Sequence, residues 1–368
     1  MFSGIGGFEL GIQRASNQST NEERQQTEPD QDMRQVQQWE TVPEVSRSIR
    51  GNGDADKGER SLLPTDDRGI RSVCVGYSEI DKYAIKVYER QFNGDNRPDL
   101  RNGAEEIQNN STNSTERKDR TTSGHTNYGD ATKINAAELP DFDLLVGGFP
   151  CQAFSVAGKR QGFDDTRGTL FFDIARVLKE KRPRHLVLEN VKGLLSHDQG
   201  KTFQTILGVL SDLGYRVEWQ VLNSKDFGVP QNRERIFIIG HLRGECGRKV
   251  FPIRQDAQVS TKRQGKVSPT ITSRYYKQGQ SDPYIVDEEK PRIRKLTPKE
   301  CERLQGFPDD WAKEGVEWCL GERCTRGKMD ACLGHFVDIS DTQRYKMCGN
   351  AVTTNTVQAV MERLFSHE

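Results

Sequence analysis

Residues 142–155 read FDLLVGGFPCQAFS, an apolar run followed at once by a glycine pair, a proline and a cysteine. The run Phe142–Val146 is short and bounded by turn residues, which predicts a buried β-strand. Cys151 then falls in a loop just beyond the carboxyl end of that strand. Open α/β sheets bind ligands at this edge. Cys151 is therefore a candidate nucleophile, and the alternative is a small buried apolar side chain.

Predicted strands and helices alternate after Cys151. Apolar residues recur at helical spacing or form short runs in helices at 170–178 and 203–213, and in strands at 185–188, 216–222 and 235–242. This alternation predicts an α/β fold with a Rossmann-like, doubly wound, mostly parallel sheet that is covered on both faces. Glu189 ends the strand at 185–188, on the same sheet edge as Cys151. Cys151 and Glu189 are therefore expected to belong to one functional site.

The amino-terminal residues form a second candidate ligand site. Gly4, Gly6 and Gly7 make a tight turn that lets a nucleotide-like ligand approach the backbone. Glu79 ends a predicted strand at Ser72–Glu79. An acid there can hold ribose hydroxyls, and the alternative is a surface carboxylate that caps the next helix. Because such a turn normally follows a strand and none precedes it in the sequence, we expect the site to lack part of its floor.

Two polar stretches interrupt this half of the chain. Residues 17–71 and 93–127 are rich in polar and charged side chains, which predicts disordered or loosely ordered inserts. After Gly240 basic residues and short β-prone runs replace the helices, so we expect a smaller, irregular, β-rich domain. The predicted division is a catalytic and cofactor domain at 1–243, a recognition domain at 244–345 and a returning segment at 346–368. Thr297 to Glu300 has the pattern of a capping box, and residues 349–352 are expected to open the last helix.

Composition restricts the class of protein. The 368 residues carry 54 basic and 54 acidic side chains, so no global field marks the chain as a nucleic-acid binder. No apolar run reaches membrane-spanning length and no signal peptide is present, which predicts a cytoplasmic protein with free thiols and no membrane partner. One group, Cys319, Cys324, Cys332 and His335, is spaced more loosely than structural zinc ligands. We therefore predict no metal site.

The ordered set of motifs resembles the DNA (cytosine-5) methyltransferases. The resemblance covers nearly the whole chain outside the two inserts. The matching pieces are FSGIGG at 2–7, Glu79, Gly129-Asp130, GFPCQ at 148–152, ENV at 189–191, QNRER at 231–235, RKLTPKEC at 294–301, QGFP at 305–308 and GNAV at 349–352.

The resemblance implies a catalytic set. Cys151 would add as thiolate to C6 of cytosine, and Glu189 would hold a proton at the ring N3. Arg235 would bind the cytosine O2, and Arg233 would support the loop and the acid. The activated C5 would take a methyl group from S-adenosyl-L-methionine.

The resemblance also implies a cofactor site and partners. The cofactor residues would be Phe2, Ile5, Gly6, Glu79 (ribose), Ile80 and Asp130 (adenine), with Pro150, Leu170, Asn350 and Ala351 closing the pocket. The substrate would be double-stranded DNA with the target cytosine flipped out of a specific short sequence. Basic and base-reading residues of 244–345 would contact that site. The protein is expected to be monomeric, and either to be paired with a restriction endonuclease or to act as an orphan or phage methylase.

Three other readings remain open at the level of sequence. An RNA cytosine-5 methyltransferase of the transfer-RNA type shares the Pro-Cys loop, but its Cys-Phe-Thr signature is missing here. A catalytically impaired DNA-binding relic fits the missing first strand but not the complete set of Cys151, Glu189 and Arg235. A nicotinamide dehydrogenase fits least, because Glu9 occupies the last glycine position of the dinucleotide fingerprint.

Overall fold

The computed structural model describes residues 6–27, 72–93, 125–150, 170–244, 249–253, 267–277, 282–287, 292–317 and 335–366. In these ranges the α-helices are α1 (Gly7–Thr27), α2 (Lys82–Tyr88), α3 (Leu170–Lys181), α4 (Lys201–Asp212), α5 (Pro298–Leu304), α6 (Asp341–Asn350) and α7 (Thr354–Phe365). The strands are β1 (Leu144–Gly148), β2 (His185–Val191), β3 (Tyr215–Asn223), β4 (Glu234–Leu242), β5 (Tyr284–Asp287), β6 (Arg292–Lys295), β7 (Glu314–Glu317) and β8 (His335–Asp338).

The central sheet is mixed. Its order is β1-β2-β4-β3, and β1 pairs with β2 in parallel, whereas β4 is antiparallel to both β2 and β3. The prediction of a mostly parallel sheet is therefore wrong for the described strands. The physical reason is the connection at 224–233, which is too short for the crossover that a parallel pairing needs, so the chain turns back into β4.

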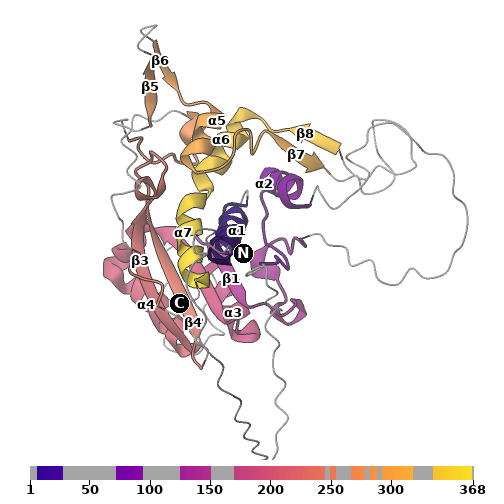
Figure 1. The fold of residues 1–368 in the computed structure, drawn as a ribbon, viewed down its shortest axis with the longest axis vertical. Helices are drawn as coiled ribbons and strands as arrows, with labels where there is room; N and C mark the ends of the chain where they lie inside the picture. Colours follow the sequence, from indigo (N-terminus) through magenta and orange to yellow (C-terminus); the bar gives the residue numbers. More distant parts are fainter. Residues whose placement is uncertain are drawn as a thin grey trace, which may run out of the picture.

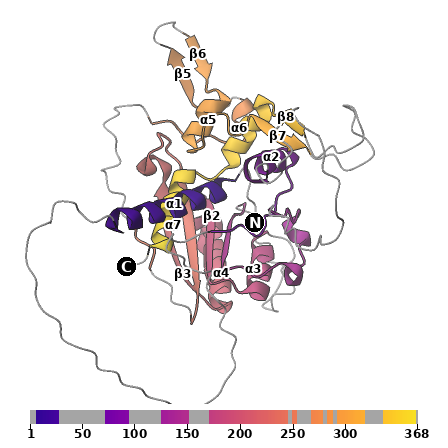
Figure 2. The same ribbon diagram turned by 45° about the vertical axis from the view of Figure 1, so that its right-hand side comes forward.

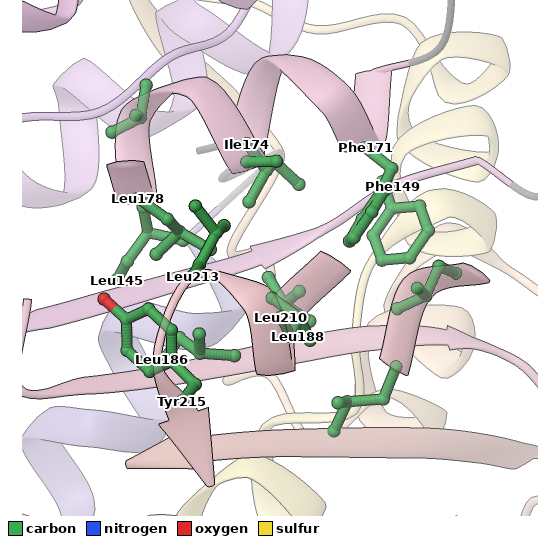
Figure 3. Close-up of a cluster of buried hydrophobic side chains, with 14 of the residues drawn as sticks. Leu145, Phe149, Phe171, Ile174, Leu178, Leu186, Leu188, Leu210, Leu213 and Tyr215 are labelled. Carbon is green, nitrogen blue, oxygen red and sulfur yellow. The ribbon is translucent and has the colours of Figure 1, made fainter. Parts of the chain in front are cut away.

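Helices cover both faces of this sheet, as the sequence predicted. On one face α3 and α4 pack on side chains from β1, β2 and β4, as Figure 3 shows for Leu145, Leu186 and Leu188. On the other face α1 and α7 lie side by side (Figure 2). Val187 and Phe237 of the sheet meet Val360 and Met361 of α7 there. Alternate residues of β2 therefore enter opposite cores, which explains why its central run, residues 186–188, is apolar without a break.

The first part of the chain is more ordered than predicted. α1 continues to Thr27 and so includes the first eleven residues of the predicted insert that begins at residue 17, and residues 28–71 lie outside the described ranges. The predicted strand at Ser72–Glu79 is reduced to a single parallel bridge between Tyr77 and Asn127. α2 follows and continues as the π-helical turn η1 (Glu89–Asn93).

The second predicted insert also contains packed residues at its end. Most of residues 93–127 lie outside the description, but His125 and Asn127 are placed. Asn93 accepts a hydrogen bond from the His125 backbone amide at 2.7 Å, and the Phe92 ring lies against the His125 ring. The two ends of this insert therefore meet, as a loop insertion requires.

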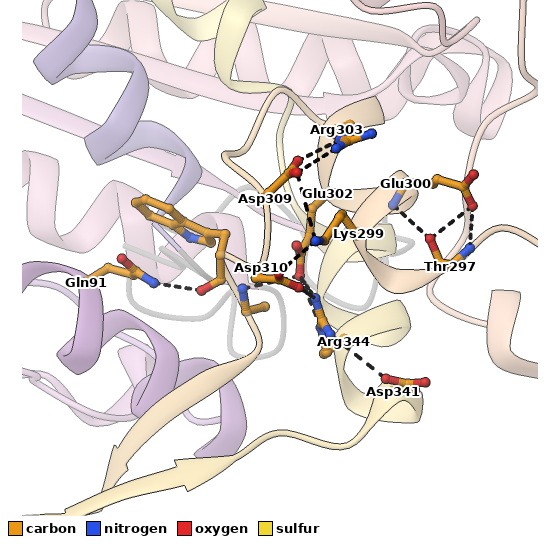
Figure 4. A network of polar contacts seen from close by, with 12 residues as sticks. Gln91, Thr297, Lys299, Glu300, Glu302, Arg303, Asp309, Asp310, Asp341 and Arg344 are labelled. Carbon is orange, nitrogen blue, oxygen red and sulfur yellow. Dashed lines mark hydrogen bonds and ion pairs between the residues drawn. The ribbon is translucent and has the colours of Figure 1, made fainter.

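Polar contacts join α5 to α6. The predicted capping box is present: Thr297 accepts from the Glu300 backbone amide, and Glu300 accepts from that of Thr297. Near this capping box, the fully buried Glu302 accepts a hydrogen bond from Arg344 Nη2 at 2.9 Å. The same nitrogen donates to Asp310 Oδ1 at 3.2 Å (Figure 4). A buried carboxylate needs such a partner, so this pair fixes how α6 lies on α5.

Two small antiparallel hairpins complete the described chain. β5 pairs with β6, and this hairpin projects from the rest of the molecule (Figure 1). β7 pairs with β8 next to α2. The prediction that residues 349–352 open the last helix is wrong. Gly349 and Asn350 end α6, Ala351 and Val352 are extended or non-helical, and α7 begins at Thr354.

Candidate active site

An ion pair joins the end of β2 to the start of β4. Arg235 Nε lies 2.9 Å from Glu189 Oε1, and both side chains are largely buried. In the antiparallel register Glu189 is opposite Phe237, and Val191 is opposite Arg235. Glu189 and Arg235 are therefore diagonal neighbours on one face of the sheet, which is within reach for long side chains. The structure thus brings together two of the predicted catalytic residues.

The environment of Glu189 favours its protonated form. Burial raises the pKa of this carboxyl above its ordinary value, although the charges of Arg235 and Arg233 act in the opposite direction. The second oxygen of Glu189 lies over the backbone of Gly148, where an added Cβ would be 3.1 Å from Oε2. Gly148 ends β1 and is the register partner of Glu189. The carboxyl therefore lies at the start of the segment that leads into Cys151, which itself lies outside the described residues.

Asn190 holds the same segment from the other side. Its side-chain amide donates to the Phe149 carbonyl at 2.8 Å, and its oxygen accepts from the Val191 backbone amide at 2.8 Å. Asn190 is buried, so neither bond competes with water. No role was predicted for Asn190 from the sequence. Its place in the sequence could have suggested one, because an amide next to Glu189 at a strand end can both donate and accept hydrogen bonds.

Arg233 is more deeply buried than Arg235 and makes different contacts. It is buried, Nη1 donates to the Ile271 carbonyl at 2.9 Å, and Nη2 donates to the Gly349 and Ala351 carbonyls at 3.0 and 2.8 Å. Burial lowers the pKa of its guanidinium to about 9, and the charge of Arg235 acts in the same direction. Its hydrogen bonds connect the start of β4 to the segments that contain Ile271 and residues 349–351. Arg233 is therefore a positioning residue.

The predicted ribose and adenine residues lie close together. Asn127 links them: its Oδ1 accepts from the Glu79 and Gly129 backbone amides at 3.2 and 2.9 Å. Glu79 Oε1 accepts from the backbone amides of Ile80 and Asp81 at 2.8 and 2.9 Å, which fixes the carboxylate.

Beside this carboxylate the side chains of Ile80 and Asp130 differ in environment. Ile80 is 73% exposed, which is unusual for a large aliphatic side chain. Asp130 Oδ1 accepts from the backbone amide and the hydroxyl of Thr132, and these bonds lower its pKa. An exposed apolar surface thus lies next to two anchored carboxylates.

The glycine turn meets the chain that follows α6. Gly6 has a left-handed φ of 82° and its carbonyl accepts from the Leu10 amide as α1 begins. A Cβ on Gly7 would lie 2.8 Å from Val352 Cγ1, so only glycine fits at this approach. Asn350 at the end of α6 is exposed and Ala351 is buried. Gly6, Asn350 and Ala351 therefore belong to adjoining segments.

The chain matches a protein-family model. Residues 117–271 and 245–317 match the model of the C-5 cytosine-specific DNA methylases. The chain is 35% identical over 331 residues to the type II methyltransferase M1.ScrFI of Lactococcus lactis subsp. cremoris, which covers 78% of this chain and 70% of that protein.

The chain belongs to the C-5 cytosine-specific DNA methylases.

Other known proteins are also similar to this methylase. The type II methyltransferase M.SsoII of Shigella sonnei is 37% identical over 291 residues, which is 66% of this chain and 70% of that protein. Among solved structures, a DNMT2 variant from Spodoptera frugiperda has a TM-score of 0.55 at 14% identity, covering 99% of this chain and 98% of that one. At that identity the likeness shows the shared fold alone.

Some predicted site residues of the methylase are not placed. Phe2, Ile5 and Cys151 lie outside the described residues, as do the three cysteines between residues 318 and 334. Pro150 is exposed at the end of the segment held by Asn190, and Leu170 is half-buried at the start of α3. Within the described ranges, no three His, Cys, Asp or Glu side chains are grouped so as to hold a metal ion. In the same ranges no helix has the length and hydropathy to cross a bilayer.

Proposed function

We propose that this DNA cytosine-5 methylase works through a transient covalent bond between Cys151 and C6 of the target cytosine, with S-adenosyl-L-methionine as methyl donor. The observation that carries the proposal is the buried pair of Glu189 and Arg235 beside Gly148. A proton-holding carboxyl and a guanidinium at that distance match the N3 and O2 edge of one cytosine. Two residues, Phe149 and Pro150, separate Gly148 from the candidate nucleophile Cys151.

Each residue in the proposed mechanism has one task. C5 of cytosine is a poor nucleophile, and addition of the Cys151 thiolate to C6 makes C5 electron-rich. Glu189 holds a proton at N3, so the negative charge that enters the ring is neutralised as the bond forms. Arg235 donates to O2 and keeps the base in the plane of the acid. After methylation C5 loses its proton, the bond to C6 breaks, and Cys151 leaves as thiolate.

The residues near Glu79 fit a nucleoside. Glu79 is held by two backbone amides, and a carboxylate has further acceptor positions for ribose hydroxyls. The exposed Ile80 offers an apolar surface to a purine ring. When bound, S-adenosyl-L-methionine supplies the methyl group that C5 takes. Phe2, Ile5, Gly6, Asp130, Pro150, Leu170, Asn350 and Ala351 are the further residues proposed to line its site.

The proposed substrate is a short sequence in duplex DNA. Because C5 and C6 are hidden in the base stack, the target cytosine must rotate out of the helix. Residues 244–345 are proposed as the recognition domain, with 1–243 and 346–368 forming the catalytic domain. The relatives M1.ScrFI and M.SsoII are named type II methyltransferases, which favours pairing with a restriction endonuclease. A monomer is the proposed state of the protein.

The proposal is tested by incubating plasmid DNA with the protein and S-adenosyl-L-methionine, followed by bisulfite sequencing. Methylcytosine at one short recurring sequence is the expected result, and Cys151→Ser should produce none. The serine variant separates the chemistry from binding, because a hydroxyl in the same place is a far weaker nucleophile. Sequence-specific methylation by Cys151→Ser would contradict the assignment of the nucleophile, and none by the wild-type protein would contradict the catalytic role.

A further inference from the structure

A lysine of α6 bridges to the loop that carries Glu79. Lys346 Nζ donates to Asp81 Oδ2 at 2.6 Å, across 265 residues of sequence. The side chains are 43% and 26% exposed, so the bridge lies at the surface and not in the core. The hydrogen bond to Asp81 raises the pKa of Lys346, with Glu79 contributing in the same direction. Both groups are therefore charged at neutral pH.

Asp81 connects this bridge to the proposed ribose ligand. Its Oδ1 accepts from the Tyr83 and Ala84 backbone amides at the start of α2. Its own backbone amide donates to Glu79 Oε1. The position of Asp81 thus sets both the start of α2 and the orientation of the Glu79 carboxylate. Lys346 restrains Asp81 from the opposite side.

The same face of α6 carries Asn350. Lys346 and Asn350 are four residues apart, so they neighbour one another on the helix surface. α2 and α6 also share an apolar cluster in which Ala84 and Val87 pack near Met347 and Ala351. The bridge therefore joins the segment of Glu79 to the helix face that ends in Asn350.

We propose that Lys346 is a positioning residue for the nucleoside half of the S-adenosyl-L-methionine site. The inference rests on the proposed function. The bridge fixes the spacing between the Glu79 segment and the end of α6, so that the ribose contact and the residues closing the pocket are formed before the ligand arrives. Preorganisation of this kind increases affinity. Glu189 and Arg235 lie on the central sheet, so the methyl-transfer step is independent of the bridge.

The test compares three variants of the full-length protein. Lys346→Met removes the charge and keeps the length, Lys346→Arg keeps the charge, and Asp81→Asn keeps an oxygen for the helix cap. Lys86→Met is the matched control, because Lys86 also bridges α2 to another element, 3.1 Å from Glu317 of β7, away from Glu79. Binding of S-adenosyl-L-methionine is measured by calorimetry, together with KM for both substrates and the single-turnover rate.

Lys346→Met should raise Kd and KM for S-adenosyl-L-methionine about two- to fivefold, the upper part of the range expected for a partly exposed pair. The KM for DNA and the single-turnover rate at saturating donor should not change. Lys346→Arg should restore most of the affinity, and Lys86→Met should match wild type. Asp81→Asn combined with Lys346→Met should cost no more than either change alone, because both break the same bridge.

Several outcomes would overturn the inference. Unchanged donor affinity in Lys346→Met is one, and equal losses in Lys346→Met and Lys86→Met, which would indicate general loosening of α2, is another. Fully additive effects of Lys346→Met and Asp81→Asn would also exclude a shared bridge. If the wild-type protein itself fails to bind S-adenosyl-L-methionine, the proposed function is wrong and the inference falls with it.

Discussion

Glu189 is under two opposing influences. The sheet buries its carboxyl, which disfavours the charge, while Arg235 and Arg233 favour the charge, and burial is the stronger of the two. A carboxyl in this position is costly to ionise in the folded protein and inexpensive to keep protonated. The same property suits an acid that must hold a proton against the ring N3 of cytosine. Burial and the proposed chemistry therefore favour the same protonation state of this side chain.

Glu189→Gln is expected to lower the single-turnover rate by about 10²–10⁴-fold, the usual contribution of a positioned acid. Binding of S-adenosyl-L-methionine should be unchanged, since Glu79 and Ile80 belong to other segments. Quench-flow measurement of methyl transfer to a DNA duplex, with calorimetry of the donor, checks both. A variant that keeps the wild-type rate would remove Glu189 from the mechanism.

The same variant should show a pH-dependent difference in thermal stability. The folded pKa of Glu189 is raised above the unfolded value, so its contribution to stability is present in acid and is lost as pH rises through the folded pKa. Glutamine does not titrate. The Tm of Glu189→Gln minus that of wild type should therefore increase from pH 4 towards neutral pH, as measured by scanning calorimetry. A difference that falls over this range would mean that Arg235 outweighs burial.

Gly148→Ala should disturb the acid without unfolding the protein. A Cβ at this position would lie 3.1 Å from Glu189 Oε2, close enough to displace the carboxylate. A small displacement of a catalytic group can lower a rate by about 10–100-fold. The single-turnover rate should fall to that extent, with Tm lowered by only a few degrees. An unchanged rate would indicate that Glu189 moves aside at no cost to the reaction.

At the scale of elements, α6 depends on a close approach to the segment 267–277. A Cβ on Gly349 would overlap the backbone of Thr272 and Ser273, which cannot move aside like a flexible side chain. Gly349→Ala is expected to lower the free energy of unfolding by about 1–3 kcal/mol, the usual cost of overpacking. Urea denaturation measures the change.

Gly208→Ala is the matched control. Gly208 lies in α4 with no atom within 4 Å of an added Cβ. Here alanine should stabilise the helix by about 0.5–1 kcal/mol. Opposite signs for two glycine-to-alanine changes in helices would attribute the cost at position 349 to the contact with the segment 267–277. Equal signs would contradict that contact.

The sequence predicted helices and strands correctly where their position depends on neighbouring residues alone. Apolar spacing located α3 and α4, and the capping box marked the start of α5 at Pro298. Strand direction depends on the connection, and the short link at 224–233 was the clue to an antiparallel β4 that the strand and helix alternation concealed. The end of α6 at Asn350 is set by packing against another segment, which no local pattern encodes.

For the molecule as a whole, long-range contacts decide how the site is assembled. Glu189 could be predicted because it ends an apolar strand on the same sheet edge as Cys151, whereas the role of Arg235 was expected only from the family resemblance. The interior position of Arg233 could not be predicted, because its supporting role was expected only from the resemblance and no local pattern shows which carbonyls an arginine will reach. Its partners lie 38, 116 and 118 residues away in the sequence. Only the folded chain shows the carbonyls through which Arg233 supports the start of β4.

Arg233→Lys should therefore destabilise the whole molecule. A guanidinium serves three carbonyls from two nitrogens here, whereas an ammonium is a compact donor that cannot span them in the same plane. Carbonyls left unpaired in a buried site cost about 1–3 kcal/mol each, so we expect a loss of roughly 2–3 kcal/mol in the free energy of unfolding. Arg303→Lys is the control, since Arg303 makes an exposed pair with Asp309 and such pairs contribute at most about 1 kcal/mol.

Urea denaturation measures the free energy of unfolding of both variants. Equal losses would show that the hydrogen bonds of Arg233 contribute no more than an exposed ion pair, whereas the larger loss at position 233 would establish it as the residue that holds β4, the segment 267–277 and the end of α6 together.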